Sequence, residues 1–135
     1  MACAMLAAMA RLSIRIDFDP SGSAFGPGMA ELLERIGEKG SIRKAAAGMG
    51  MSYRKAWLLI QGLHQTFGGA VVDTETGGAS GGGAKLTDLG HRLIRIYRTI
   101  ETRALKVSAE DMQTLATLVQ KDAVPRKKPP ARRPA

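Results

Sequence analysis

Residues 40–63 constrain the fold more than any other part of the chain, because their sequence, GSIRKAAAGMGMSYRKAWLLIQGL, predicts two short helices joined by a tight turn. Ser41 is a favourable N-cap for a helix over 41–48, and Ser52 is a favourable N-cap for a helix over 52–66. The Gly-Met-Gly step between them ends the first helix without a long loop. We therefore expect the two helices to cross each other.

The second of these helices is predicted to have one buried face and one free face. Its apolar side chains recur at helical spacing and are Ala56, Leu59, Ile60, Leu63 and Phe67. The side chains opposite them are Arg54, Leu58, Gln61 and Gln65. Small alanines in the first helix allow the second to cross it closely, which is typical of a helix-turn-helix. An αα-hairpin that only packs against a core is the alternative interpretation.

Two segments before this pair complete the predicted core. Residues 12–18 alternate between apolar and polar side chains, which predicts a strand with one buried face that pairs with later strands. Residues 20–28 are a loop by composition, and an apolar stripe then predicts a helix over 29–39 that Gly40 closes. Three successive helices give the tri-helical core of helix-turn-helix domains.

A β-hairpin, or wing, is predicted over residues 70–87. A β-prone run, 70–74, is followed by a glycine-rich segment whose backbone N–H groups can approach a phosphate closely. A nucleotide-binding P-loop is excluded, because Ala84 precedes Lys85 where that motif requires glycine, and Leu86 follows where it requires Ser or Thr. A hairpin tip that contacts no partner is the alternative interpretation.

The C-terminal third predicts two helices and a tail. Thr87 caps a long helix over 87–106, and Ser108 with the acidic residues after it begins a last helix over 108–124. The long helix has an apolar stripe that includes Leu89, Leu93, Ile96, Ile100 and Leu105. Because this stripe is wider than a small core covers, we expect a homodimer. Residues 125–135 are basic and proline-rich and predict a disordered tail, which either holds phosphates or only solubilises the chain.

Composition favours a polyanionic partner. The formal net charge is +8 and the sequence pI is near 10.2. The single cysteine, Cys3, cannot form an internal disulfide, which fits a cytoplasmic protein, and the apolar N-terminus lacks the basic start of a signal peptide. His64 and His91 are isolated, so no catalytic or metal-binding constellation is present in the sequence. We therefore expect neither an enzyme nor a cofactor.

The segments GSIRKAAAGMGMSYRKAWLLI and TGGASGGGAKLTDLGHRLI resemble the N-terminal DNA-binding domain of ModE-type molybdate-responsive transcription regulators. The helix-turn-helix part is also similar, more distantly, to LysR-type regulators. The resemblance covers roughly residues 29–101 and implies an α+β winged helix-turn-helix that binds double-stranded DNA as a dimer. Regulators of the full type continue into molybdate-binding β-barrel domains, whereas this chain ends in a helix and a basic tail. Molybdate is therefore not expected to bind this chain alone.

The predicted DNA-binding residues fall into two groups. The helix that starts at Ser52 is expected to enter a major groove and read bases with Ser52, Tyr53, Arg54, Lys55, Leu58 and Gln61. Phosphates are expected to be held by Ser41, Arg43, Lys44, Gly78, Gly81, Gly82 and Lys85.

Two other functions fit the same sequence. The first is a protein-interaction adaptor that keeps the winged-helix scaffold and uses the surface of Trp57 and Leu58 together with the last helix. The second is an oxyanion sensor, which would need a polar, donor-rich pocket, and the glycine-rich tip is its candidate.

Overall fold

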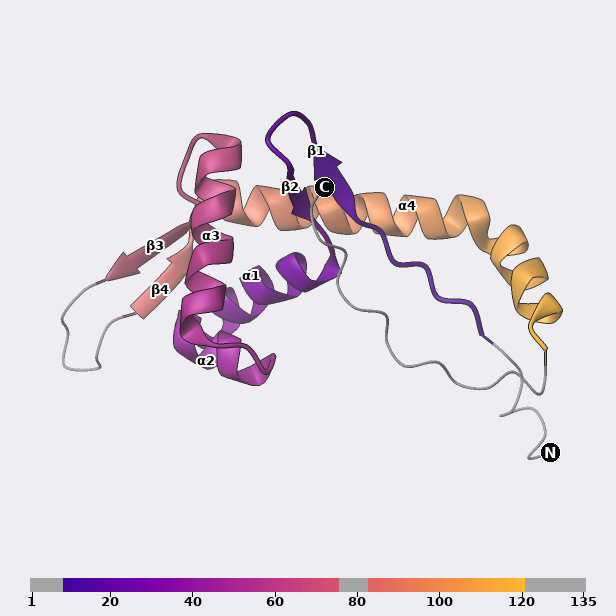
Figure 1. The fold of residues 1–135 in the computed structure, drawn as a ribbon, viewed down its shortest axis with the longest axis horizontal. Coiled ribbons are helices and arrows are strands. Elements are labelled where there is room, and N and C mark those ends of the chain that lie inside the picture. The colour runs from indigo at the N-terminus through magenta and orange to yellow at the C-terminus, as the bar shows by residue number, and fades with distance from the viewer. Residues whose placement is uncertain (1–8, 76–82, 121–135) are drawn as a thin grey trace. The chain divides into compact units, whose positions relative to one another are not determined.

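The computed structural model describes residues 9–75 and 83–120. These belong to two compact units, one of residues 13–100 and one formed by residues from both ends of the chain. Figure 1 shows the elements, which in chain order are β1 (Ile16–Phe18), β2 (Ser23–Phe25), α1 (Pro27–Lys39), α2 (Ile42–Gly48), α3 (Tyr53–Phe67), β3 (Val72–Glu75), β4 (Gly83–Leu86) and α4 (Asp88–Leu118). The architecture is α+β, as predicted, and is that of a winged helix with a long C-terminal helix.

The three central helices begin and end close to their predicted positions. α1 starts at Pro27, two residues earlier than predicted, because proline fits the first turn of a helix, where its missing N–H is not needed. Gly40 ends α1 in the left-handed conformation, with φ of 67°, and its N–H donates to the carbonyl of Ile36 at 2.8 Å. α2 and α3 each begin one residue after the serine that caps them.

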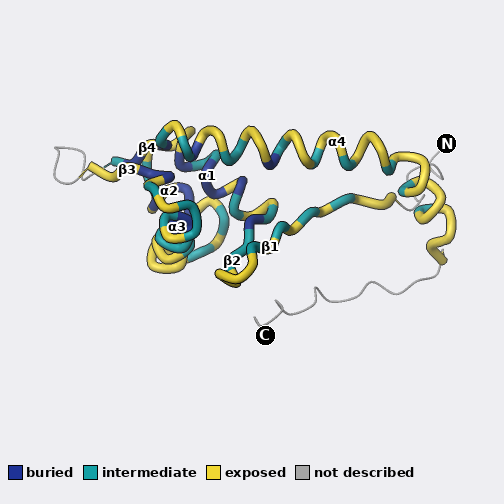
Figure 2. The backbone as a smooth tube through the Cα atoms, turned by 90° about the horizontal axis from the view of Figure 1, so that it is seen from above, coloured by how far each residue is buried: buried dark blue, intermediate teal, exposed yellow. Residues whose placement is uncertain are grey.

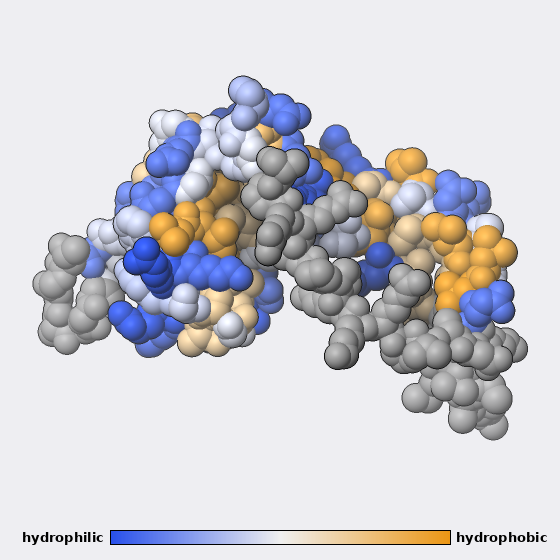
Figure 3. Space-filling view, in the orientation of Figure 1, coloured by the Kyte–Doolittle hydropathy of each residue, from blue (hydrophilic) through white to orange (hydrophobic). Residues whose placement is uncertain are grey.

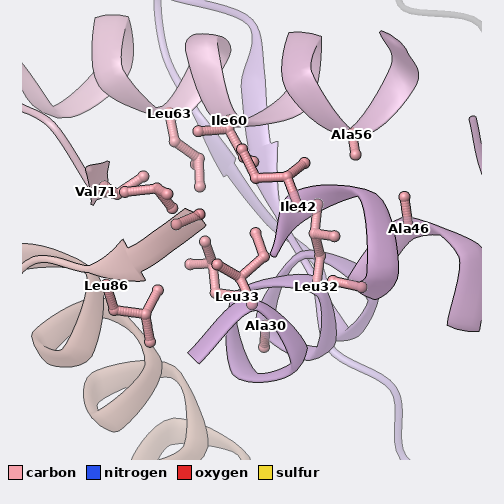
Figure 4. Close-up of a cluster of buried hydrophobic side chains, with 14 of the residues drawn as sticks. Ala30, Leu32, Leu33, Ile42, Ala46, Ala56, Ile60, Leu63, Val71 and Leu86 are labelled. Atoms are coloured by element: carbon pink, nitrogen blue, oxygen red, sulfur yellow. The ribbon is translucent and has the colours of Figure 1, made fainter. Parts of the chain in front are cut away.

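The core lies where α1, α2, α3 and the base of the wing meet (Figure 2). It is built mainly from aliphatic side chains together with the aromatic side chains of Phe25 and Tyr97, and no polar or charged side chain is buried in the described residues. Figure 4 shows Ile60 and Leu63 of α3 converging with Leu33 of α1 and with Val71 and Leu86 from either side of the wing. Each fully buried aliphatic side chain contributes about 1.5–3 kcal/mol to stability, so this cluster fixes how α3 sits on the domain.

The predicted loop over 20–28 is wrong in part, because it contains β2. β1 does not pair with later strands of the wing but forms an antiparallel hairpin with β2, in which Ile16 lies opposite Phe25. A tight turn makes this local pairing available, since Gly22 has φ of 75° and donates to the carbonyl of Phe18 at 2.9 Å. The hairpin places Phe25, which is 3% exposed, in the core.

Hydrogen bonds attach the base of the wing to Gly40 and to the start of α4. The N–H of Ala84 in β4 donates to the carbonyl of Gly40 between α1 and α2 at 2.9 Å. The hydroxyl of Thr87 donates to the carbonyl of Ala70 at 2.7 Å and accepts from the N–H of Gly90 at 3.1 Å, so it caps α4 as predicted. The wing and the first turn of α4 are thus tied to the tri-helical core.

α4 is one continuous helix from Asp88 to Leu118. The prediction of two separate helices, over 87–106 and 108–124, is therefore wrong. Ser108 does not cap a new helix, because its hydroxyl donates to the carbonyl of Ala104 at 2.7 Å. A serine whose hydroxyl is satisfied one turn back can stay within a helix. Residues 88–100 of α4 belong to the first compact unit and residues 101–118 to the second.

The apolar stripe of α4 divides between packed and exposed side chains. Leu89, Leu93 and Ile94 pack against the core of the first unit. Tyr97 is 2% exposed, and its hydroxyl donates to the carbonyl of Ile14 at 2.6 Å. The stripe side chains that are exposed are Ile96, Ile100 and Leu105. Part of the apolar stripe from which a dimer is predicted is therefore buried within the domain itself.

Several predictions lie outside the described residues. These are the apolar N-terminus through residue 8, the wing tip with Gly78, Gly81 and Gly82, and the basic tail over 125–135. Among the helices of residues 9–75 and 83–120, none has the length and apolar character needed to cross a membrane.

Candidate nucleic-acid interface

Capping serines fix the first turns of α2 and α3. The hydroxyl of Ser41 accepts from the backbone N–H of Lys44 at 3.1 Å, and the hydroxyl of Ser52 accepts from the N–H of Lys55 at 3.1 Å. Each bond satisfies one of the N–H groups that a helix start leaves without a partner. The two serines, both predicted to contact DNA, therefore have a structural role in the conformation seen here.

The turn between α2 and α3 sets the direction in which α3 leaves the core. Gly50 has φ of 68°, and the N–H of Met51 donates to the carbonyl of Ala46 at 3.0 Å. Ala45 and Ala46 of α2 and Ala56 of α3 are each at most 1% exposed, and such small buried side chains allow two helices to approach each other closely. The turn is the one that the spacing of caps and glycines predicts.

The opposite face of α3 is open. The exposed side chains on this helix include Tyr53, Arg54, Lys55, Trp57, Leu58 and Gln65. Gln61, predicted to contact bases, is half-buried. Trp57 is 42% exposed; the sequence predicts its surface as that of the protein-interaction adaptor and does not place it among the DNA-binding residues. Figure 3 shows apolar and strongly hydrophilic surface side by side over α3.

The first turns of α2 and α3 carry cations where the helix dipole favours anions. Arg43 and Lys44 lie in the first turn of α2, and Arg54 and Lys55 in the first turn of α3. Neither first turn contains an acidic residue. Within residues 9–75 and 83–120 none of the four cations forms an ion pair with a carboxylate. A cation placed at a helix start costs roughly 0.3–1 kcal/mol, so this arrangement is favourable chiefly when an anion is bound.

Arg43 and Tyr53 are brought together although they belong to different helices. The guanidinium carbon of Arg43 lies over the ring of Tyr53, 4.8 Å from its centroid. Both side chains were predicted to bind DNA, but their contact was not, because it depends on how α2 and α3 cross.

The wing places one predicted residue on the surface. Lys85 is exposed on β4, opposite Asp73 of β3. The register runs from Val72 paired with Leu86 to Glu75 paired with Gly83. Lys85 is therefore held at a fixed position on the same unit as α3.

The two histidines do not form a chemical site. The Nε2 atom of His64 accepts from the N–H of Val72 at 3.3 Å, which makes His64 a hydrogen-bonded link between α3 and the wing. His91 is exposed on α4. Within the part of the chain that the structure describes, no group of three or more His, Cys, Asp and Glu residues could hold a metal ion.

The sequence is similar to those of ModE proteins. It is 39% identical over 75 residues to molybdenum transport protein ModE of Herbaspirillum seropedicae, covering 56% of this chain and 28% of that protein. It is 39% identical over 87 residues to molybdenum-pterin-binding protein MopB of Rhodobacter capsulatus, covering 64% of this chain and 32% of that protein. It is 39% identical over 88 residues to the DNA-binding transcriptional dual regulator ModE of Escherichia coli strain K12, covering 63% of this chain and 34% of that protein.

These matches confirm the resemblance that the helix-turn-helix and wing segments suggest. The chain spans about a third of the length of the curated relatives that it matches. None of the three names describes an enzyme. No protein-family model matches the chain.

Proposed function

This chain is ModE-like over more than half of its length, and from that premise we propose that it is a transcriptional regulator that reads DNA sequence through α3. It works in the cytoplasm, where DNA is accessible, and it is not an enzyme. The relative from Escherichia coli carries the name of a DNA-binding regulator, which supports DNA as the partner. Base contacts come from the exposed face of α3, and phosphate contacts come from α2 and the wing.

The observation that carries this proposal is the set of four cations at the starts of α2 and α3, which no carboxylate of the described residues neutralises. Cations at helix starts do not stabilise the fold, because the positive end of the helix dipole repels them. A phosphate bound there would be attracted by these cations and could accept hydrogen bonds from backbone N–H groups. The exposed face of α3 also carries Leu58, which is 50% exposed and can contact a thymine methyl group. The start of α2 thus offers groups for phosphates, and the exposed face of α3 offers groups for bases.

Arg54→Ala tests whether α3 reads sequence. A bidentate contact between an arginine and a guanine is worth about 1–3 kcal/mol of discrimination, so this variant should weaken binding to the cognate duplex far more than to a scrambled one. The cognate duplex is obtained by selection from a random pool with the wild-type protein, and both duplexes are titrated at several salt concentrations. If Arg54→Ala weakens both duplexes by the same factor, α3 is not the reading element.

Removal of residues 125–135 is the matched control for general attraction. This segment holds five cations and nothing large and apolar, so its removal should weaken both duplexes alike. The logarithmic salt dependence should become shallower by up to ~0.9 for each phosphate that the truncated protein no longer neutralises. A selective decrease in cognate binding in this truncation would mean that the tail, too, contributes to sequence reading.

The regulator is also proposed to be a homodimer that associates through the last part of α4. In the last part of α4 an apolar seam of Leu105, Met112 and Leu115 follows heptad spacing, and Val119, directly after the helix ends at Leu118, lies seven residues beyond Met112. Leu105, Leu115 and Val119 are 51%, 59% and 49% exposed. Such side chains repeated along one helix favour a second helix against them.

A charge placed on the seam tests this dimer. Leu115→Lys should give a monomer in sedimentation at micromolar concentration, because it buries a charge between the two helices. Val107→Lys is the control, since Val107 is 87% exposed and lies off the seam, and it should leave the dimer intact. A wild-type protein that sediments as a monomer would refute the proposal. If the dimer forms, the DNA site should be a pseudo-palindrome with half-sites about one helical turn, or a multiple of it, apart.

Molybdate is proposed not to bind this chain alone. An oxyanion site needs several convergent buried donors, and the core of the described residues contains no buried polar or charged side chain. Titration calorimetry with molybdate and tungstate at neutral pH tests this, and a saturable heat at a defined stoichiometry would overturn it.

A further inference from the structure

The contact between Arg43 and Tyr53 joins two elements of the helix-turn-helix through their side chains. Arg43 lies in the first turn of α2, and Tyr53 is the first residue of α3. The guanidinium carbon lies 4.8 Å from the centroid of the ring. A cation at this distance is attracted to the negative face of an aromatic ring.

The polar groups of both residues are available to a partner in the described structure. Arg43 is exposed and forms no ion pair or hydrogen bond with residues 9–75 and 83–120. Tyr53 is 42% exposed, and within the same residues its hydroxyl forms no hydrogen bond. The guanidinium therefore keeps its N–H donors for an external acceptor while the ring holds its position.

The charges around Arg43 are unfavourable for its guanidinium, so a contact such as that with the ring of Tyr53 is needed to hold it in place. Arg43 stands beside Lys44 and close to the basic start of α3, where neighbouring cations and the dipole of α2 both act against it. A free arginine would respond by turning away into water, because its side chain has many rotamers. The ring of Tyr53 compensates for part of this repulsion and limits the rotamers that Arg43 occupies.

We propose that Tyr53 is a positioning residue, which holds the guanidinium of Arg43 ready for a DNA phosphate and does so through its ring. This inference rests on the DNA-binding function proposed above and assigns Tyr53 a different role from that of a base contact. Arg43 is the residue that touches DNA at this point, and Tyr53 acts through it. Cation–π contacts at exposed sites shift an equilibrium roughly two- to fivefold, which sets the size of the expected effect.

The test is the factor by which Arg43→Ala weakens binding to a duplex of random sequence at low salt, because phosphate contacts do not depend on sequence. This factor is measured in four backgrounds: wild type, Tyr53→Phe, Tyr53→Leu and Trp57→Leu. Tyr53→Phe keeps the ring and removes the hydroxyl. Trp57→Leu is the matched control, because Trp57 has the same 42% exposure and no cation lies over its ring in the described residues.

We expect the Arg43→Ala factor to be the same in wild type, Tyr53→Phe and Trp57→Leu, and to be about two- to fivefold smaller in Tyr53→Leu. An unchanged factor in Tyr53→Leu overturns the proposal, as does a reduced factor in Tyr53→Phe, which would assign the coupling to the hydroxyl. A second readout without DNA is the ring-current shift of the Arg43 side-chain protons by NMR. It should persist in Tyr53→Phe and disappear in Tyr53→Leu.

Failure of this inference can be told apart from failure of the proposed function. If Arg43→Ala has no effect in wild type while Arg54→Ala weakens cognate binding, α3 reads DNA and the positioning role is wrong. If neither variant affects any duplex, the DNA interface itself is wrong.

Discussion

Replacing Gly90 by alanine should destabilise the domain, because the main chain of Val71 occupies the space that a β-carbon needs. A β-carbon at Gly90 would overlap the carbonyl oxygen of Val71 and would lie 3.3 Å from both the carbonyl carbon of Val71 and a methyl group of Leu86. The oxygen cannot simply withdraw, since it accepts from the N–H of Thr87 at 3.1 Å. The added methyl group therefore has to move backbone at the junction of the wing and α4.

The expected change in the free energy of unfolding is the sum of two destabilising contributions and one stabilising contribution. Overpacking that shifts backbone costs typically about 1–3 kcal/mol. Weakening the bond from the Thr87 N–H to the Val71 carbonyl adds up to about 1 kcal/mol. Alanine recovers up to about 1 kcal/mol because it favours the helix more than glycine does. The net decrease in unfolding free energy should be about 1–3 kcal/mol, which lowers the Tm by roughly 4 °C or more for each kcal/mol in a domain of this size.

Gly62→Ala is the matched control for this prediction. Gly62 lies inside α3, and nothing lies within 4 Å of a β-carbon built there. The same substitution should therefore raise stability by up to about 1 kcal/mol through helix propensity alone. Urea and thermal denaturation followed by circular dichroism give both values. The close-contact reasoning is refuted if Gly90→Ala is as stable as Gly62→Ala.

Two further substitutions test contacts that hold the domain together. Tyr97→Phe removes the hydroxyl that donates to the carbonyl of Ile14, and it should cost about 1 kcal/mol or more in urea denaturation with unchanged helix content; a decrease below the error of the measurement would show that water replaces this bond. Ser52→Ala should cost about 0.5–2 kcal/mol, and Ser52→Gly only a few tenths, because glycine tolerates the cap position; the reverse order would contradict the capping role.

The helix-turn-helix could be predicted from the sequence because its determinants are local. Each capping serine lies three residues before the N–H group that it satisfies, and the turn needs only the glycines between the helices. The buried face of α3 follows from apolar residues at helical spacing, and Ala56, Ile60 and Leu63 are all buried as predicted. Short-range patterns are thus sufficient to locate the candidate interface.

The contacts that the sequence did not predict join residues far apart in the chain or depend on competition between two local signals. Tyr97 and Ile14 are 83 positions apart, and no periodicity links them. Ser108 carries the signature of a helix start, but its hydroxyl bonds back to α4 and the helix continues. β2 was predicted as loop because proline and glycine dominate its neighbourhood, although those residues are what allow the hairpin to turn.

The wing is attached to the rest of the domain at its base. Changes at the base and changes beyond the last strand pair therefore have different effects on α3. The register up to the pair of Glu75 and Gly83 is held from below by the bond from Ala84 to the carbonyl of Gly40. Residues inserted or deleted beyond that pair leave α3 and its caps untouched. In general, each doubling of the length of a connection between two strands adds only about 0.6 kcal/mol to the entropic cost of closing it. The length of the wing can therefore change without a change in how α3 is held on the domain.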